Sequence, residues 1–176
     1  TVISPGVAPS VTIDSPGSSL KWAVGDTIHF SGHATDGQGH PIPASGLSWS
    51  LIVHHCPSGC HTHLVQTFEG VGSGAFAAPA HEYPSYLELT LTATDSTGTS
   101  ATVSRQLDPA TVDLTFTSVP SGATLSVGLF TGTAPFTRTV MVGSHNTVIA
   151  PDQALAGHPS GFESWSDGGA RTHDIT

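Results

Sequence analysis

The chain has 176 residues, 37% of them hydrophobic, and its 4 Lys and Arg residues against 13 Asp and Glu residues give a formal net charge of -9 with histidine neutral. Because a phosphate backbone or an anionic membrane is bound through a basic surface, this balance argues against nucleic acid and acidic lipid as partners. No apolar run approaches the roughly 20 residues of a transmembrane helix, so membrane insertion is not expected.

The first part of the chain carries strand patterns separated by turn residues. Residues 1–9 are expected to be a linker that remains after a longer precursor is cut. Alternating polar and apolar residues then indicate strands at 11–14, 26–30, 47–53, 61–68, 73–78, 86–93 and 99–107. In residues 47–53 and 86–93 the apolar side chains share one face, and Trp49 is expected in the core. These short strands without a helical period predict an antiparallel, immunoglobulin-like β-sandwich over residues 10–108.

A second, smaller domain is expected over residues 109–176. The Asp-Pro-Ala sequence at 108–110 breaks the alternation, which resumes at 112–118, 124–127, 136–142 and 147–150. This pattern predicts a small β-sandwich, with a closing strand expected beyond Thr176. The predicted fold class is therefore all-β, with two tandem antiparallel sandwich domains.

Residues 54–63 contain both cysteines of the chain and four of its 11 histidines. Cys56 and Cys60 enclose three residues that suit the tip of a hairpin, and cysteines facing each other across such a turn are close enough for a disulfide. A disulfide favours an oxidising compartment, so the protein is expected to be secreted. The alternative, in which both thiolates ligate zinc, requires a reducing compartment.

The histidines around this turn predict a metal site. His61 and His63 are two residues apart on a strand and therefore share a face. If Cys56 pairs with Cys60, His55 lies opposite His61, and three imidazoles converge as a tetrahedral zinc or copper ion with one open position requires. His81 is expected to approach from a neighbouring strand.

The remaining residues near this predicted site are less well placed. His54 should point to the other face unless a bulge shifts the register, and Glu88 is the nearest carboxylate in the predicted arrangement. The alternative for the whole cluster is a polar, glycine-rich loop whose histidines are solvated or bonded to backbone carbonyls. That interpretation is preferred for the histidines outside the cluster, which are His29, His33, His40, His145, His158 and His173.

Two further binding sites are considered. Asp36 and Asp95 lie beside glycine-rich turns and are candidate calcium ligands, although Asx-turns explain the same residues. The candidates for a glycan-stacking platform are Trp22, Tyr83, Tyr86 and Trp165, although aromatic residues on short strands usually pack in the interior. No organic cofactor is expected.

Two stretches resemble known families. Residues 24–32, 34–37 and 89–98 resemble the PKD-like and immunoglobulin-like accessory domains of secreted bacterial proteins. The string from Leu47 through the histidine and cysteine residues to Leu89 is similar to the module that follows sugar-dehydrogenase-like (glucose/sorbosone dehydrogenase) β-propellers. The segment from Thr115 to Ala170 resembles the small PEGA-like domain that often follows that module.

The resemblance implies a non-catalytic companion of an enzyme, with the catalytic domain upstream in the same polypeptide. No dehydrogenase residue can be carried over, because the propeller is not part of these 176 residues. The sequence shows no general base, nucleophile or substrate cleft, so we expect no enzyme. The alternatives are a carbohydrate-binding module, a small metalloenzyme at the histidine hairpin, and a surface-assembly subunit that self-associates through free edge strands.

Overall fold

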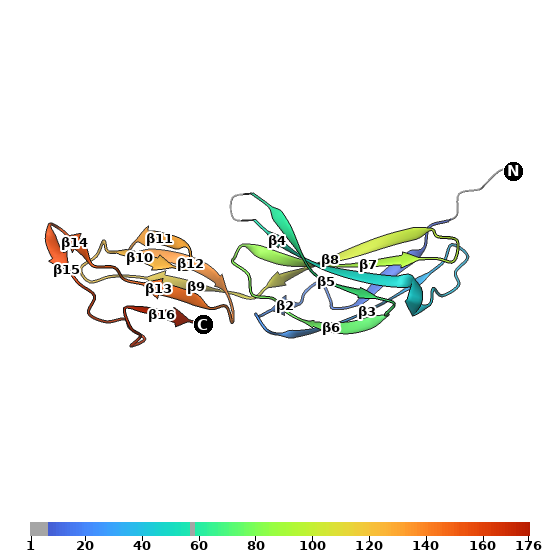
Figure 1. Cartoon of the computed structure of the whole chain (residues 1–176), viewed down its shortest axis with the longest axis horizontal. Helices are drawn as coiled ribbons and strands as arrows, with labels where there is room; N and C mark the ends of the chain where they lie inside the picture. Colours follow the sequence, from blue (N-terminus) through green and yellow to red (C-terminus); the bar gives the residue numbers. More distant parts are fainter. Residues whose placement is uncertain (1–6, 57–58) are drawn as a thin grey trace. The chain divides into compact units, whose positions relative to one another are not determined.

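The computed structural model describes residues 7–56 and 59–176, and it confirms the predicted all-β class (Figure 1). It contains sixteen strands and one short 3-10 turn, Ala44–Gly46, and no α-helix among the described residues. Within those residues, no helix has the length and apolar character that crossing a bilayer requires. The chain divides into two compact units after Ala110, close to the boundary expected at 108. Most of the predicted linker, residues 1–6, lies outside the described residues.

The first unit is a sandwich of two sheets. The smaller sheet has the order β1 (Ser10–Ser15), β3 (Thr27–Thr35) and β6 (Ser73–Ala77). The larger sheet has the order β2 (Lys21–Trp22), β8 (Ser100–Pro109), β7 (Ser85–Thr94), β4 (Leu47–His55) and β5 (His61–Glu69).

One short pair at the edge of the larger sheet departs from the antiparallel pattern that was predicted for the sandwich. The two-residue strand β2 pairs with β8 in parallel. Side chains fix it there: Lys21 Nζ lies 2.9 Å from Asp108 Oδ2, and the indole N–H of Trp22 donates to the Leu107 carbonyl at 3.0 Å. Trp22 is only 1% exposed, so this strand closes the core although it is too short to show an alternating pattern.

Alternate residues of β4 and β7 form the core, as predicted. Leu51 on β4 and Leu89 on β7 are fully buried, and so is Trp49 at 1% exposure. The ring centroids of Phe30 and Trp49 are 4.7 Å apart and join the two sheets. Gly32 permits the close approach of the sheets, because a Cβ atom there would lie 2.6 Å from the Thr12 carbonyl oxygen and 2.9 Å from the Trp49 ring.

The β4–β5 pair contains a β-bulge that determines which residues of β5 face inward. Before the bulge Leu51 pairs with Gln66, and after it Ile52 pairs with Leu64, so Val65 is the additional residue. Because side chains alternate along a strand, one extra residue reverses the faces of everything beyond it. His61 and His63 therefore face the same side as the buried residues of β4.

The second unit consists of three small sheets around its own core. Its strands are β9 (Thr111–Phe116), β10 (Thr124–Val127), β11 (Phe130–Thr133), β12 (Phe136–Met141), β13 (Asn146–Ile149), β14 (Gln153–Leu155), β15 (His158–Ser160) and β16 (Thr172–Ile175). The sheets have the orders β11-β10-β13-β16, β12-β9 and β14-β15. Phe116, Leu125, Val127 and Val148 are buried in the core, and Trp165 packs against it.

Candidate metal centre

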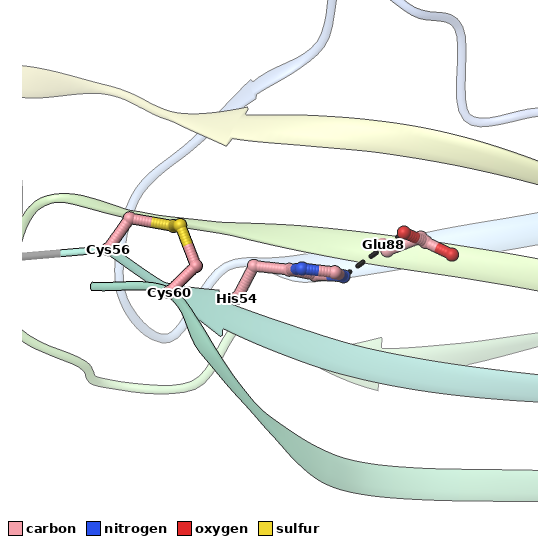
Figure 2. The surroundings of a disulfide bond; sticks show 4 residues. All are labelled: His54, Cys56, Cys60 and Glu88. Carbon is pink, nitrogen blue, oxygen red and sulfur yellow. Dashed lines mark ion pairs between the residues drawn. A yellow bond between two sulfur atoms is a disulfide. The ribbon is translucent and has the colours of Figure 1, made fainter.

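The disulfide predicted from the cysteine spacing is present. Cys56 and Cys60 are bonded to each other directly after β4 and before β5 (Figure 2). These are the two cysteines of the chain and neither is free, so the alternative with thiolate zinc ligands is wrong for this state. The bond fixes the end of the hairpin, where His55 pairs with His61 in the register on which the metal prediction depends.

Four imidazole rings gather on the inward side of this hairpin end. The ring centroids of His55 and His61 are 5.0 Å apart, and those of His61 and His63 are 4.9 Å apart. His81, from the connection between β6 and β7, lies 4.5 Å from the His55 ring and 5.6 Å from the His63 ring. We call these four residues the histidine cluster.

The histidine cluster has a buried floor and an open side. His55 is 8% exposed and Ser85, its partner on β7, is 5% exposed. His55 Nε2 and Ser85 Oγ are both buried without a hydrogen-bond partner. His61 and His63 are exposed. Since buried polar atoms are normally satisfied, two orphaned atoms on adjacent strands indicate a place for a ligand or an ordered water.

The orientation of His81 leaves one of its nitrogens available to a ligand. Its Nδ1 lies 3.3 Å from the Glu82 carbonyl oxygen. A carbonyl only accepts hydrogen bonds, so Nδ1 carries the proton and Nε2 keeps its lone pair. Metal-binding histidines are usually oriented in this way, by donating their second ring nitrogen to a carbonyl or carboxylate.

The surroundings of His55 favour its neutral form. Burial is the main cause that lowers the pKa of His55, followed by the neighbouring His81 and His61; the charge of Glu82 acts in the opposite direction, and His63 lowers the pKa further. Metal ions bind neutral imidazole and compete with protons for it. An imidazole held neutral is therefore ready to coordinate.

The ring spacing suits a metal, but the ring orientations do not. With a metal–nitrogen distance of about 2.0 Å, two imidazoles on one tetrahedral ion have centroids about 5 Å apart. Among the described residues, however, no group of three or more His, Cys, Asp or Glu side chains could hold a metal ion as it stands. The contacts of His55 with His61 and His81, and of His61 with His63, are edge-to-face. Binding therefore requires rotation of these rings, and the broad χ2 preference of histidine permits it.

His54 and Glu88 do not join the histidine cluster. Strand alternation turns His54 to the opposite face of the sheet, where its Nε2 lies 3.0 Å from Glu88 Oε2 (Figure 2). His54 Nε2 is buried without a hydrogen-bond partner, so its contact with Glu88 is a close approach of the imidazole and the carboxylate and not a hydrogen bond. The His54 ring stacks on Tyr86 at 4.6 Å, and the other oxygen of Glu88 accepts hydrogen bonds from Thr90 and Ser104.

The candidate glycan-binding aromatics are divided between the two units. The prediction for Trp22 is wrong, because this side chain is buried at 1% exposure and offers no face to a glycan. Tyr83 is 37% exposed, while one face of Tyr86 is covered by His54. Trp165, in the second unit, lines a cavity of about 370 Å³ together with Phe162. Its indole nitrogen donates to the Arg171 carbonyl at 3.3 Å.

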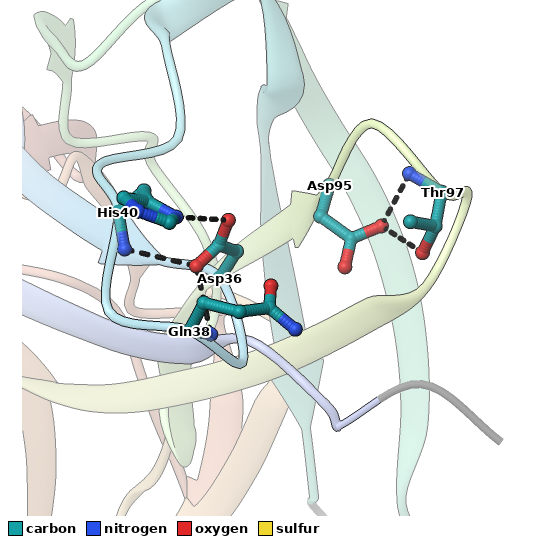
Figure 3. Close-up of polar contacts among 5 residues, drawn as sticks. All are labelled: Asp36, Gln38, His40, Asp95 and Thr97. Atoms are coloured by element: carbon teal, nitrogen blue, oxygen red, sulfur yellow. Dashed lines mark hydrogen bonds and ion pairs between the residues drawn. The ribbon is translucent and has the colours of Figure 1, made fainter. Parts of the chain in front are cut away.

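The candidate calcium residues form Asx-turns. Asp36 Oδ1 accepts the backbone N–H groups of Gln38 and His40, and Asp95 Oδ1 accepts that of Thr97 (Figure 3). The backbone bond from His40 is the main cause that lowers the pKa of Asp36, and the hydroxyl of Thr97 is the main cause for Asp95. Asp95 Oδ1 also accepts hydrogen bonds from the Thr97 hydroxyl at 2.6 Å and from the Thr99 backbone N–H at 2.9 Å. Calcium binding stays a prediction, since donors of the protein itself already surround both oxygens.

One residue of the candidate centre was not identified from the sequence. Ser85 carries no motif, and its place beneath the histidine cluster follows only from its pairing with His55. The distance along the chain is 30 residues, so only the register between β4 and β7 reveals it.

The chain matches no protein-family model, and neither a curated protein nor a solved structure is similar enough to count as a match.

Proposed function

We propose that the chain is a non-catalytic module of an extracellular protein and that its histidine cluster binds one zinc or copper ion. The observation that carries the proposal is the convergence of four imidazoles above the buried, unpartnered Nε2 of His55. Imidazole is a preferred ligand of both metals. The disulfide supports an oxidising compartment, in which such a module would serve a catalytic domain upstream in the same polypeptide.

The metal would have a structural role. Three of the ligands belong to the β4–β5 hairpin, whereas His81 belongs to the connection that carries the chain from the smaller sheet to the larger one. A bound ion would tie these two segments together at the end of the sandwich. Because it binds the folded arrangement and not the unfolded chain, the ion would add its binding free energy to the stability of the first unit.

Metal content and metal titration of the full, untagged chain test this proposal. We expect one equivalent of metal per chain, lost in the His61→Ala/His63→Ala double variant. His54→Ala is the matched control, because it removes an imidazole next to the hairpin turn but on the opposite face. Retention of metal by the double variant, or no binding by the wild-type chain after supplementation, would disprove the proposal.

A second candidate function is glycan binding by the second unit. It is supported by the cavity of about 370 Å³ in which Trp165 and Phe162 are accompanied by Gln153 and Glu163. Aromatic faces combined with polar side chains are a usual composition of such pockets. Retention on a panel of insoluble polysaccharides tests it: Trp165→Ala should abolish retention, and Tyr83→Ala, in the other unit, should not.

A further inference from the structure

A single loop forms one wall of the cavity in the second unit. Residues 161–171 connect β15 to β16 without regular secondary structure, and we call them the aromatic loop. They include Phe162 and Trp165, the two aromatic residues that line the cavity of about 370 Å³. The centroids of these two rings are 6.1 Å apart, and both side chains are only partly buried against the core. The shape of the cavity therefore depends on what holds this loop in place.

The imidazole of His173, on β16, holds the aromatic loop at two points. Its Nδ1 lies 2.7 Å from the Ala170 carbonyl oxygen, and its Nε2 lies 2.8 Å from Asp167 Oδ2. The ring also contacts Trp165 edge-to-face, with centroids 6.0 Å apart. Gly169 leaves the space that the ring occupies, since the three atoms closest to a Cβ at this position all belong to the imidazole. His173 is thus packed directly against the part of the loop that carries Trp165.

The two hydrogen bonds of His173 exist together only while its ring is protonated. Carbonyl and carboxylate oxygens accept hydrogen bonds, and a neutral imidazole has only one N–H group to donate. In the neutral ring a lone pair would face the lone pairs of an oxygen at 2.7 or 2.8 Å, so one of the two contacts must open. Among the groups that face the ring, the carboxylates of Asp167 and Asp174 favour the protonated form. Trp165 from the loop and Val148 from β13 are uncharged.

From this geometry we infer that His173 is a positioning residue of the cavity, which holds the aromatic loop in place while it is protonated and releases the loop when it is neutral. The inference rests on the second candidate function, since the cavity would then take a glycan at mildly acidic pH and lose it as the pH rises. Arg171 limits the released part to the residues before it. Its guanidinium stays charged and donates to the Ala150 carbonyl and to Asp152 Oδ2 at every relevant pH.

Trp165 provides a direct measure of the aromatic loop in the full, untagged chain. The other two tryptophans, Trp22 and Trp49, are each 1% exposed, so quenching of tryptophan emission by acrylamide reports mainly on Trp165. The quenching constant should rise with pH, and the midpoint of the rise should coincide with the pKa of His173 measured by nuclear magnetic resonance. A residue that only filled space beside the loop would give no such pH profile.

Two variants separate His173 from other titrating groups. Asp167→Asn should abolish the pH dependence and keep the loop in place at every pH, because an amide offers a donor as well as an acceptor and can bond to the neutral ring. His158→Gln removes an exposed histidine of the same unit and is the matched control, so its quenching profile should equal that of the wild-type chain. Retention on the panel of insoluble polysaccharides gives the functional readout. The wild-type chain should be retained below the quenching midpoint and lose retention above it, whereas Asp167→Asn should be retained on both sides.

The possible failures are distinguishable. Quenching that does not change with pH, or that changes equally in Asp167→Asn, would overturn the inference. Retention that is the same on both sides of the quenching midpoint would overturn the control of binding by His173, while glycan binding itself would stand. Absence of retention at every pH, together with the expected quenching profile, would overturn the second candidate function and the binding role inferred from it, while the pH response of the loop would stand.

Discussion

His55 in the first unit and His173 in the second unit are both held by their neighbours, but by neighbours of opposite kinds. His55 is surrounded mainly by other imidazoles, and its Nε2 has no partner. His173 lies between two acceptors, with Nδ1 2.7 Å from the Ala170 carbonyl oxygen and Nε2 2.8 Å from Asp167 Oδ2. Burial and like charges lower the pKa of His55, whereas the hydrogen bond to Asp167 is the main cause that raises the pKa of His173.

The difference separates a candidate ligand from a structural residue. Both ring nitrogens of His173 face acceptors, so the protonated ring satisfies both contacts and no lone pair is left for a metal. His55 is kept neutral, with a nitrogen that lacks any partner. A histidine is therefore available to a metal because of its surroundings, and the number of histidines in a segment is only an indirect guide.

The largest expected effect is a metal-induced stabilisation confined to the first unit. At a free metal concentration of a thousandfold over Kd, the first unit should gain about 4 kcal/mol, or more than about 10 °C in melting temperature. Differential scanning calorimetry measures the shift, and hydrogen exchange of β4 and β5 against β13 and β16 locates it. Addition of a chelator should reverse the gain. If metal slowed hydrogen exchange equally in the second unit, binding would be non-specific, and the difference between the surroundings of His55 and His173 would not determine where metal binds.

Removal of the disulfide should have a smaller effect, again limited to the first unit. Cys56→Ser/Cys60→Ser releases a very short loop, for which chain entropy predicts a loss of about 2 kcal/mol or less. Because the bond holds His55 opposite His61, metal affinity should fall with stability. Chemical unfolding and metal titration of the oxidised chain and the double variant measure both quantities. An unchanged metal affinity would mean that the β4–β5 pairing alone fixes the cluster.

The β-bulge shows what sequence patterns predict and what they do not. The cysteine spacing predicted the pairing of His55 with His61, because a disulfide fixes register locally. Phe68 pairs with the buried Trp49 and therefore faces inward. With strict alternation along residues 61–68, His61 and His63 would then have faced outward. The bulge at Val65 allows both Phe68 and the histidine pair to face inward. No residue type in the sequence indicates a bulge at this position. The position of Ser85 was missed for a similar reason, since it depends on a pairing 30 residues away.

The sequence patterns also failed to predict the shortest strands and the residues that contact His173. β2, β14 and β15 have two or three residues each, which is too few to show alternation. The buried faces of β4 and β7, in contrast, were predicted correctly because nine and ten residues repeat the same pattern. His173 was expected to be solvated or bonded to a carbonyl, and it does contact the Ala170 carbonyl, but its contact with Asp167 closes a six-residue loop that no pattern predicted.

The two units should respond to pH with opposite signs when metal is removed by a chelator. In the folded first unit the pKa of His55 is lowered. Its contribution to the free energy of unfolding is therefore fully present above pH 6.5 and is lost as the pH falls through the folded-state pKa. In the folded second unit the pKa of His173 is raised. Its contribution to the free energy of unfolding is therefore fully present below pH 6.5 and is lost as the pH rises through the folded-state pKa. Unfolding of the first unit at pH 7 and pH 5 should therefore show destabilisation by acid.

Nuclear magnetic resonance titration of the imidazoles measures these two pKa values directly. Asp167→Asn should remove the largest cause of the raised pKa of His173, so this pKa should fall toward 6.5, while the pKa of His55 should stay unchanged. The groups that face His55 are His61, His63, His81 and Glu82, so Glu82→Gln should lower the pKa of His55 further. Equal pKa values for His55 and His173 in the wild-type chain would contradict the comparison.

The smallest expected effect comes from Gly169, which lies directly against the His173 ring. The three atoms closest to a Cβ at this position all belong to that imidazole, so Gly169→Ala should push the ring away from Asp167. The pKa of His173 should then return toward 6.5. The melting temperature should change only slightly, because half of the Asp167 side chain is exposed and water screens the pair. Gly161→Ala is the matched control, since its Cβ would meet only Asp152 Oδ1 at an ordinary distance of 3.5 Å. Metal binding by the first unit should be the same in both variants. A pKa of His173 that stays raised in Gly169→Ala would contradict the expected displacement of the ring from Asp167.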